Sequence, residues 1–419
     1  MALCVFEDYA VKNFGPLTDT RPVYEMLCGT STLLDKVLKH LGKDREVFLF
    51  TRKYLEDIVS ERHPKTRVNR QPDGDDLLFV NGCLLLDTES ARMVRGLRRG
   101  EALLVGSRVA AARLDGKALQ PDWFDGLAEI DPSSSISSAC HTKRQATITL
   151  TTYPWDLLEH GPRLIAAEAS GQLLKRRNVS GKAYYKKSVE IEEHVLIDGR
   201  KGPVVLGENV LVEAFSKIVG PAYIGSGTVV FSNSVLSGCC VGPVCRVGGE
   251  VESSIFIGYS NKRHYGYLGH SIVGEWVNMG AGTTVSNLKN TYGTVRVNVC
   301  GKRVDTGRQF LGSFFGDHVK TSIGCMVSGG LNVGVCSHVY RHVSEDVPAF
   351  TIYWPERKNE LLLESALATA RRMMARRGIS PSEAYVKMLE HLFHTTAGER
   401  SSLSVRQGKT TFYNTSQHP

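Results

Sequence analysis

Aliphatic residues recur at intervals of six in the middle of the chain, beginning with Leu206, Val212, Ile218, Ile224, Val230 and Leu236. Small or β-branched residues follow each of them by four positions: Val210, Ser216, Ala222, Thr228, Ser234 and Cys240. Ordinary half-buried strands alternate with period two, so a period of six argues against an antiparallel sandwich rich in Val and Gly. Each six-residue unit predicts one short strand and one corner. Three such hexapeptide units make one triangular coil of a left-handed parallel β-helix, with the aliphatic side chains inside.

The period of six continues to Val339 after a slip of one residue near Val241. Solenoids of this kind bury each repeat against its neighbours. Proteins built in this way are usually trimers, so we expect a homotrimer.

The segments on either side of the repeats have a different pattern. Apolar runs at 77–80 and 102–105 predict buried strands, and 23–41 and 154–168 predict helices. Alternating strands and helices favour an α/β domain. After Trp354, apolar residues at helical spacing predict short C-terminal helices. The predicted segments are the α/β domain (1–170), a basic linker (171–187), the β-helix (188–353), the C-terminal helices (354–397) and a flexible tail (398–419).

Composition narrows the possible partners. The chain has 419 residues, and 51 Lys and Arg against 43 Asp and Glu give a net charge of +8. This mild excess argues against a nucleic-acid-binding arm and suits anionic small molecules. The sequence contains no run of about 18 apolar residues and opens without a signal peptide, so we expect no membrane span. Ten cysteines without a CxxC pair predict free thiols in the cytoplasm.

The densest polar stretch interrupts the repeats between residues 258 and 289. Since three units of six make one coil, His264 and Gly282 are expected to stack on one face. We therefore expect one groove to be lined by His264, Tyr267, Asn278 and Asn287. A zinc site of His264, His270 and His318 is less favoured, because the His-x4-His spacing of solenoid zinc enzymes does not occur here.

Several strings in the chain resemble a known family. HYGYLGHSIVGEWVNMGAGTTVSNLKN resembles the acetyltransferase half of the bifunctional, GlmU-like glucosamine-1-phosphate acetyltransferase/N-acetylglucosamine-1-phosphate uridyltransferase. VRVNVCGKRVDTGRQFLGSFFGDHVKTSIG is similar to the archaeal sugar-1-phosphate nucleotidylyltransferases with the same solenoid. VFEDYAVKNFGPLTDTRP, LFVNGCLLL and YPWDLLEH resemble a divergent bacterial branch of sugar nucleotidyltransferases. The resemblance implies a nucleotidyltransferase-like fold for the N-terminal domain.

For the β-helix, the resemblance implies acetyl transfer from acetyl-CoA to an aminosugar phosphate. His264 matches the general base, a task that suits a side chain with a pKa near neutral pH. A backbone N–H near Ala281 would stabilise the oxyanion. Substrate-contacting positions are matched by Tyr267, Asn278 and Asn287. The cations placed to meet the phosphates of CoA are Lys302, Arg303 and Arg308.

Two positions depart from the family pattern. The family usually has Arg where this chain has Gly225, and Lys where it has Glu252. Both of those residues help to hold the sugar phosphate, so phosphate binding should weaken here. Lys262, Arg263 or Arg296 would then take their place, or the acceptor is a different sugar.

The N-terminal domain departs further. The family opens with a Gly-rich loop ending in Arg, which cradles a triphosphate, whereas residues 6–21 lack those glycines and keep Arg21 as the phosphate candidate. The family holds Mg²⁺ with an Asp in a Gly-Asp pair, and the matching Gly82-Cys83 has no carboxylate. Asp156 is the remaining metal-ligand candidate.

The sequence thus predicts a cytoplasmic transferase of nucleotide-sugar biosynthesis. It would acetylate an aminosugar-1-phosphate and transfer a nucleotidyl group from an NTP to a sugar-1-phosphate, with acetyl-CoA and Mg²⁺ as cofactors. One alternative is a nucleotidyltransferase whose β-helix serves only for trimerisation. The other is a non-catalytic regulatory or assembly subunit with two degenerate sites.

Overall fold

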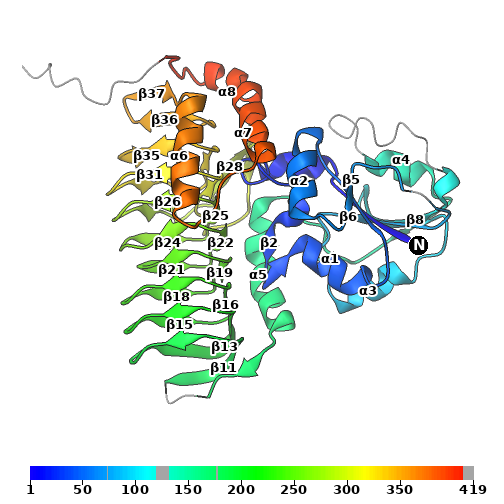
Figure 1. Cartoon of the computed structure of the whole chain (residues 1–419), viewed down its shortest axis with the longest axis horizontal. Coiled ribbons are helices and arrows are strands. Elements are labelled where there is room, and N and C mark those ends of the chain that lie inside the picture. The colour runs from blue at the N-terminus through cyan, green and yellow to red at the C-terminus, as the bar shows by residue number, and fades with distance from the viewer. Residues whose placement is uncertain (73, 119–131, 176–177, 409–419) are drawn as a thin grey trace, which may run out of the picture. The chain divides into compact units, whose positions relative to one another are not determined.

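The computed structural model describes the chain except residues 73, 119–131, 176–177 and 409–419. The chain forms two compact units (Figure 1). The N-terminal unit comprises Met1–Phe14 and Thr20–Gly161, and the β-helix unit comprises Gly15–Asp19 and Pro162–Pro419. No helix in the described ranges is long and apolar enough to cross a membrane.

The N-terminal unit is built on a seven-stranded sheet in the order β5-β4-β1-β6-β8-β7-β9. The strands are β1 (Ala2–Phe6), β4 (Val47–Phe50), β5 (Arg67–Val68), β6 (Leu77–Asn81), β7 (Glu101–Val105), β8 (Arg108–Leu114) and β9 (Thr142–Gln145). β1 pairs in parallel with both β4 and β6, whereas β8 runs antiparallel to β6 and β7. The two apolar runs predicted as strands are β6 and β7, which confirms both.

The helices of this unit are α1 (Leu33–Leu41), α2 (Glu56–Arg62), α3 (Thr88–Arg95), α4 (Pro132–Ser138) and α5 (Pro154–Glu168), which extends into the second unit. α5 confirms the helix predicted at 154–168. The helix predicted at 23–41 is wrong in its first half, because α1 begins only at Leu33. Residues 27–32 form a small hairpin instead, β2 (Leu27–Cys28) and β3 (Ser31–Thr32), which turns at Gly29 with φ +80°. α1 then begins after Thr32, because Thr32 and Asp35 form a capping box.

The second unit is a left-handed parallel β-helix with three faces of stacked short strands (Figure 1). The first face holds β13 (Leu196–Leu206), β16 (Ala222–Ile224), β19 (Cys240–Val241), β22 (Ile255–Gly258), β25 (Ile272–Glu275), β30 (Phe314–Phe315) and β33 (Asn332–Val333). The second holds the first part of β13 with β15 (Lys217–Val219), β18 (Val235–Ser237), β21 (Glu250–Glu252), β24 (Tyr267–Gly269), β27 (Thr284–Val285), β32 (Met326–Val327) and β35 (His342–Val343). The third holds β12 (Glu190–Ile191), β14 (Leu211–Val212), β17 (Val229–Val230), β20 (Arg246–Val247), β23 (Asn261–Lys262), β26 (Asn278–Met279), β31 (Lys320–Thr321), β34 (His338–Val339), β36 (Thr351–Trp354) and β37 (Arg357–Glu360).

The aliphatic series found in the sequence lines the inside of the β-helix. All six of its residues from Leu206 to Leu236 are 0% exposed, and the small residues that follow them are buried at the corners. The hexapeptide prediction is therefore confirmed in its register. In place of the basic linker predicted at 171–187, the structure has β10 (Gln172–Leu173) and β11 (Val179–Tyr185). β11 pairs in parallel with β13, so this segment adds strands to the β-helix.

Later coils depart from eighteen residues. Val247 pairs with Lys262, a step of 15, and Asn261 pairs with Asn278, a step of 17. Asn278 pairs with Lys320, a step of 42, because residues 286–313 leave the coil. This insertion carries a two-stranded hairpin, β28 (Arg296–Val299) and β29 (Lys302–Asp305).

The C-terminal helices are α6 (Leu363–Ala375), α7 (Glu383–Thr395) and α8 (Ala397–Ser402). Leu367, Ala370 and Met374 of α6 are buried, as expected for one apolar face. The flexible tail predicted from residue 398 needs correction, because α8 follows and Arg400 is 2% exposed, paired with Glu360 at 2.9 Å. The end of that tail lies outside the described residues.

Candidate functional site

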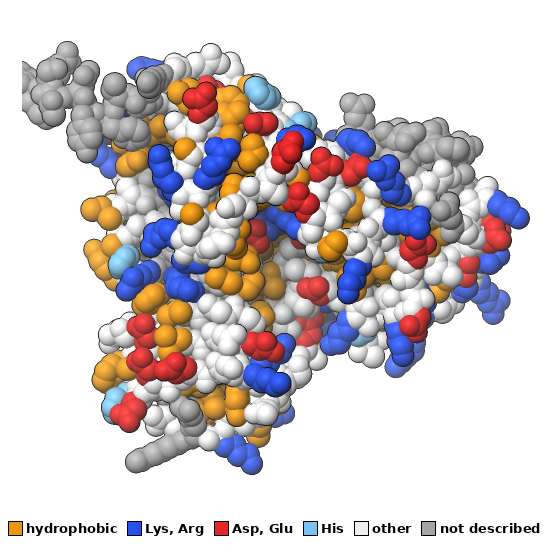
Figure 2. Space-filling model, in the orientation of Figure 1, with side chains coloured by type: hydrophobic (Ala, Val, Ile, Leu, Met, Phe, Trp, Pro, Cys, Tyr) orange, Lys and Arg blue, Asp and Glu red, His pale blue; other side chains and the backbone are white. Residues whose placement is uncertain are grey.

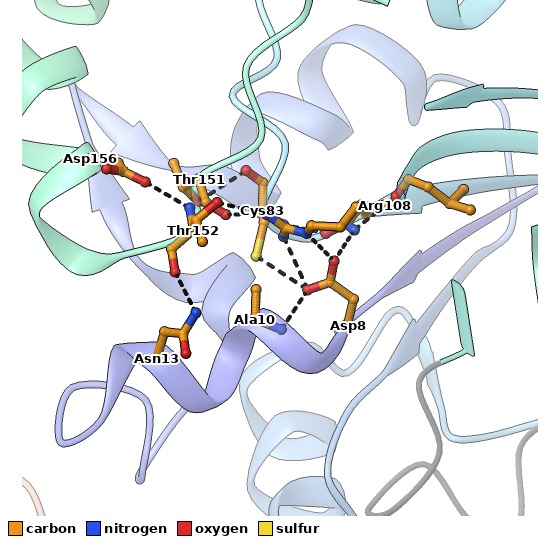
Figure 3. Close-up of polar contacts among 10 residues, drawn as sticks. Asp8, Ala10, Asn13, Cys83, Arg108, Thr151, Thr152 and Asp156 are labelled. Atoms are coloured by element: carbon orange, nitrogen blue, oxygen red, sulfur yellow. Dashed lines mark hydrogen bonds and ion pairs between the residues drawn. The ribbon is translucent and has the colours of Figure 1, made fainter. Parts of the chain in front are cut away.

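Polar side chains of the N-terminal unit gather where the central strands end. Asp8 follows β1, Asn81 ends β6, and Arg108 begins the antiparallel β8 (Figure 3). The carboxyl ends of parallel strands form the ligand-binding edge of doubly wound sheets. The cluster therefore lies at the edge where a nucleotide would be expected.

Asp8 and Arg108 form a buried ion pair at this edge. Arg108 Nε donates to Asp8 Oδ2 at 2.7 Å and Nη2 donates to Oδ1 at 3.1 Å, with side-chain exposures of 8% and 0%. Asp8 also accepts from the Asn81 amide at 2.8 Å and from the Ala10 N–H at 3.0 Å. Burial alone would lower the pKa of Arg108, but its bonds to Asp8 outweigh this and raise the pKa. The carboxylate of Asp8 is thus fully engaged within the protein.

The segment Asn81–Cys83, which matches the position of the family's metal-binding aspartate, contributes side chains to the same cluster. The Asn81 carbonyl oxygen Oδ1 accepts the Cys83 N–H at 2.9 Å, and the Cys83 thiol faces Asp8 Oδ1 at 4.0 Å. Burial raises the pKa of Cys83 far above its usual range, so the thiol stays protonated and unreactive.

Asp156 lies beside the cluster, near the start of α5. Its Oδ2 accepts the backbone N–H of Thr152 at 2.7 Å and that of Tyr153 at 3.0 Å (Figure 3). The metal role predicted for Asp156 would therefore depend on Oδ1. Since Asp8 is neutralised by Arg108, these side chains do not form a two-carboxylate magnesium site. Within the described ranges, no group of three His, Cys, Asp or Glu side chains is placed to hold a metal ion.

Arg21, the predicted phosphate contact, is only 2% exposed. Its backbone carbonyl accepts from Arg52 Nη2 at 2.7 Å, and Arg52 also contacts Glu7 at 3.3 Å. Burial would raise the pKa of nearby Glu25, but Arg62, His63 and Arg21 lower it overall. The structure therefore places Arg21 among buried carboxylates.

In the β-helix, His264 lies at the exposed corner between β23 and β24. The Gly282 N–H donates to the Tyr265 carbonyl oxygen at 3.0 Å, so residues 264 and 281 are neighbours on successive coils. The expected stacking partner of His264 was Gly282. The coil here is one residue shorter than eighteen, which makes that partner Ala281.

The backbone N–H groups around Ala281 differ in whether they are hydrogen-bonded within the described residues. Gly280 N–H donates to Thr321, Gly282 N–H to Tyr265 and Thr283 N–H to Gly280. For the Ala281 N–H, no acceptor is found among the residues that the structure describes. This N–H lies one coil away from His264, about 4.8 Å along the stacking direction.

Tyr267 and Asn287, two of the predicted substrate contacts, are joined directly. Asn287 Nδ2 donates to the Tyr267 hydroxyl at 2.8 Å, and that hydroxyl donates to Glu252 Oε2 at 2.8 Å. Asn287 Nδ2 also lies 2.9 Å from His270 Nδ1. We name these four residues the β24 cluster: Glu252, Tyr267, His270 and Asn287.

His270, which the sequence suggested only as a less favoured zinc ligand, is also a member of this cluster. Burial lowers the pKa of His270, with Glu252 opposing and Arg308 adding to the effect, which favours the neutral ring. Because Nδ1 accepts from Asn287, the proton of the neutral ring is on Nε2. The signal in the sequence was the step of 17 between His270 and Asn287, which equals one coil in this part of the β-helix.

Asn278 lies apart from the β24 cluster. It is on the third face, in β26, and its Oδ1 accepts from Asn261 Nδ2 at 3.3 Å. Asn261 in turn accepts from Arg377, which follows α6, at 2.8 Å. The structure therefore joins Tyr267 and Asn287 but places Asn278 on the neighbouring face.

The predicted phosphate contacts fall in three environments. Lys302 and Arg303 are exposed on the β28–β29 hairpin. Lys and Arg side chains are spread over the face of the molecule that Figure 2 shows. Arg308 follows that hairpin and lies close enough to His270 to lower its pKa. Lys262 is different, because it points into the β-helix and is 2% exposed.

Three comparisons relate these features to known proteins. A family model described as sugar nucleotidyl transferase matches residues 3–177. A bifunctional sugar-1-phosphate nucleotidylyltransferase/acetyltransferase of Sulfurisphaera tokodaii is 41% identical over 91 residues, 22% of this chain and 23% of that protein. The bifunctional protein GlmU of Methanocaldococcus jannaschii is 35% identical over 193 residues, 43% of this chain and 40% of that protein.

A third relative is matched over most of its length. The bifunctional protein GlmU of Methanococcus aeolicus is 27% identical over 381 residues, 76% of this chain and 88% of that protein. The first two matches span less than half of those relatives. The chain is therefore similar, over much of its length, to GlmU-like bifunctional sugar-1-phosphate nucleotidyltransferase/acetyltransferases.

Proposed function

We propose that the β-helix, residues 188–353, transfers the acetyl group of acetyl-CoA to the amino group of an aminosugar-1-phosphate. The α/β domain, residues 1–170, would transfer a nucleotidyl group from an NTP to a sugar-1-phosphate. The protein would act in the cytoplasm as a homotrimer in nucleotide-sugar biosynthesis. The names of the relatives support both activities.

In the acetyl transfer, His264 takes the proton of the amine as the amine nitrogen forms a bond to the acyl carbon. The carbon–sulfur bond of the thioester breaks, and the CoA thiolate takes up a proton. The Ala281 N–H, free of other acceptors in the described part of the chain, would donate to the developing oxyanion. Its position one coil above His264 is the observation that carries this proposal.

Two residues of the β24 cluster, on the second face, would orient the substrate. Tyr267 and Asn287 are held in place by their hydrogen bond and would contact the sugar. Asn278 would act from the neighbouring face. Lys302, Arg303 and Arg308 would meet the phosphates of CoA, because guanidinium and ammonium groups bind phosphate through charge-assisted hydrogen bonds.

The test is acetylation by the full chain carrying His264→Ala. Loss of a general base costs about 10²–10⁴-fold in kcat, while binding of acetyl-CoA should persist. His194→Ala is the matched control, since His194 is also an exposed histidine of the β-helix. Full activity in His264→Ala would remove His264 from the mechanism.

The Asp8–Arg108 pair favours a second candidate for the N-terminal unit. An engaged carboxylate and a neutralised arginine suit binding of a nucleotide sugar better than metal-assisted transfer. Calorimetry with UTP or dTTP, with and without Mg²⁺, and an assay for pyrophosphate release test this. Binding without pyrophosphate release supports the second candidate, whereas Mg²⁺-dependent release supports nucleotidyl transfer by Arg21 and Asp156.

A further inference from the structure

Lys262 occupies an inner position of the third face that holds apolar residues, Val247 and Met279, in the coils directly before and after it. It pairs with Val247 in the coil before it, and its neighbour Asn261 pairs with Asn278, which precedes the buried Met279. The side chain therefore points inward, and its exposure is 2%. A buried ammonium is costly unless it is hydrogen-bonded, so its partners show what it does.

The ammonium of Lys262 binds two backbone carbonyls at one corner. Nζ donates to the Gly248 carbonyl oxygen at 2.8 Å and to the His264 carbonyl oxygen at 3.1 Å. Both carbonyls belong to the corner between the third and second faces. The residue whose carbonyl is held is the proposed general base.

In other coils, hydroxyl groups donate the hydrogen bonds to backbone carbonyls at this same corner. Ser216 Oγ donates to the Phe231 carbonyl at 2.9 Å, Ser234 Oγ also donates to Phe231, and Thr283 Oγ1 donates to the Gly280 carbonyl at 2.8 Å. Each of these residues immediately precedes a strand of the second face. In the two coils between them, that position is Gly249 and Gly266, which have no hydroxyl.

The geometry shows that Lys262 fills this gap. A Cβ on Gly249 would lie 2.9 Å from Lys262 Nζ and 2.9 Å from the His264 carbonyl oxygen. The ammonium is therefore where a side chain at 249 would be. The corner at 248–249 has two residues, whereas the corner at 263–266 in the next coil has four. The longer corner is therefore stacked on a shorter one. Lys262 supplies from inside the donor that the shorter corner lacks.

We propose that Lys262 is a positioning residue for catalysis, whose ammonium holds the corner 263–266 and thereby sets the place of His264 beside the Ala281 N–H. This inference rests on the proposed function, in which His264 is the base. It also assigns Lys262 a place inside the fold instead of a contact with the sugar phosphate. Burial lowers the pKa of Lys262 to about 8, in keeping with an ammonium enclosed by backbone carbonyls.

The test compares Lys262→Met with Lys320→Met in the full chain. Met fits the inner file, as Met279 shows one coil above. Lys320 is a matched control, because its buried Nζ also binds two carbonyls, those of Trp276 and His318, at a different corner. Two quantities are measured: the kcat and KM of acetylation, and hydrogen exchange of the amides at 263–266.

Lys262→Met is expected to speed amide exchange at 263–266 by about tenfold or more and to lower kcat by about 10–100-fold, since misplacing a catalytic group by about 1 Å costs about that much. KM for acetyl-CoA should change less than kcat. Lys262→Gln, whose amide can still donate, should recover part of both losses. Lys320→Met should leave exchange at 263–266 unchanged.

Unchanged exchange and kcat in Lys262→Met would overturn the inference. Unchanged kcat with faster exchange would also overturn it, because the corner would then be held without consequence for catalysis. Full activity of His264→Ala is a separate result, since it removes the base assignment itself. If Lys262→Met does not fold, Lys262→Gln tests the inference alone. A kcat below that of the parent protein supports the positioning role of Lys262, and an equal kcat overturns it.

Discussion

Arg108 donates two hydrogen bonds to the carboxylate of Asp8 in the interior of the N-terminal unit, from Nε to Oδ2 at 2.7 Å and from Nη2 to Oδ1 at 3.1 Å. Arg108 also donates through Nη1 to the Thr151 carbonyl and the Thr152 hydroxyl, both at 3.0 Å (Figure 3). This one guanidinium therefore ties the end of β1 to the segment that leads into α5. At this edge of the sheet, the charge of the Asp8 carboxylate is therefore neutralised by Arg108.

Removing one partner of this ion pair should destabilise the N-terminal unit. Arg108→Met leaves the Asp8 carboxylate buried without its cation, which costs about 3–5 kcal/mol. Urea unfolding followed by circular dichroism should show this loss. Asp8→Leu combined with Arg108→Met should recover much of it, because no uncompensated charge remains. A single variant as stable as the parent protein would mean that the pair is hydrated and weak.

The β24 cluster depends on a glycine. A Cβ on Gly269 would lie 2.2 Å from the Tyr267 hydroxyl oxygen and 2.6 Å from Asn287 Nδ2. Gly269→Ala should therefore push both side chains apart and lower kcat/KM for acetylation by about 10–100-fold. Gly398→Ala is the control, because no atom lies within 4 Å of its Cβ position. Equal activity of the two variants would exclude the cluster from the acetyl-transfer site.

The β-helix was predictable because its interior obeys one rule over many coils. Leu206 to Leu236 keep a step of six, and a step of six has few other structural meanings. The rule fails where corners shorten. Lys262 sits 15 residues after Val247, so counting by eighteen places it outside. For the same reason the sequence placed Asn278 in one groove with Tyr267 and Asn287, although the structure puts it on the neighbouring face, and it did not place His270 in that groove.

The N-terminal site was less predictable, because its contacts are between distant segments. Asp8 and Arg108 are 100 positions apart and share no motif. The sequence shows that Gly82-Cys83 lacks a carboxylate, but only the folded sheet shows that Asn81 turns to Asp8 instead. Ion pairs of this kind follow from topology and not from local pattern.

The β28–β29 hairpin offers a test of CoA binding. Lys302 and Arg303 are exposed there, and attraction between exposed charges is screened by salt. Lys302→Gln with Arg303→Gln should raise the Kd of acetyl-CoA by about tenfold at low salt and flatten its salt dependence. Calorimetry measures both. Lys201→Gln with Lys217→Gln removes the same charge from exposed positions in the first coils of the β-helix. This control should change neither the Kd of acetyl-CoA nor its salt dependence.

The β-helix should lose stability in acid through His338. Burial, with Lys320 beside it in the stack, lowers the pKa of His338 to about 4. An unfolded histidine has a pKa of about 6.5, so the native state binds fewer protons than the unfolded state between these values. The stabilisation is complete above about pH 6.5 and is lost as the pH falls to about 4, with a total of about 3 kcal/mol.

His338→Gln should remove this part of the pH dependence, leaving only what other groups contribute. Urea midpoints of the two proteins at pH 7.5, 6, 5 and 4.5, each at fixed ionic strength, measure the difference directly. The parent protein should lose more stability between pH 6 and 4.5 than the variant does. His194→Gln, a change at an exposed histidine, should follow the parent protein. Parallel curves for the parent protein and His338→Gln would mean that water reaches His338 in the native state, because a hydrated imidazole keeps its ordinary affinity for protons.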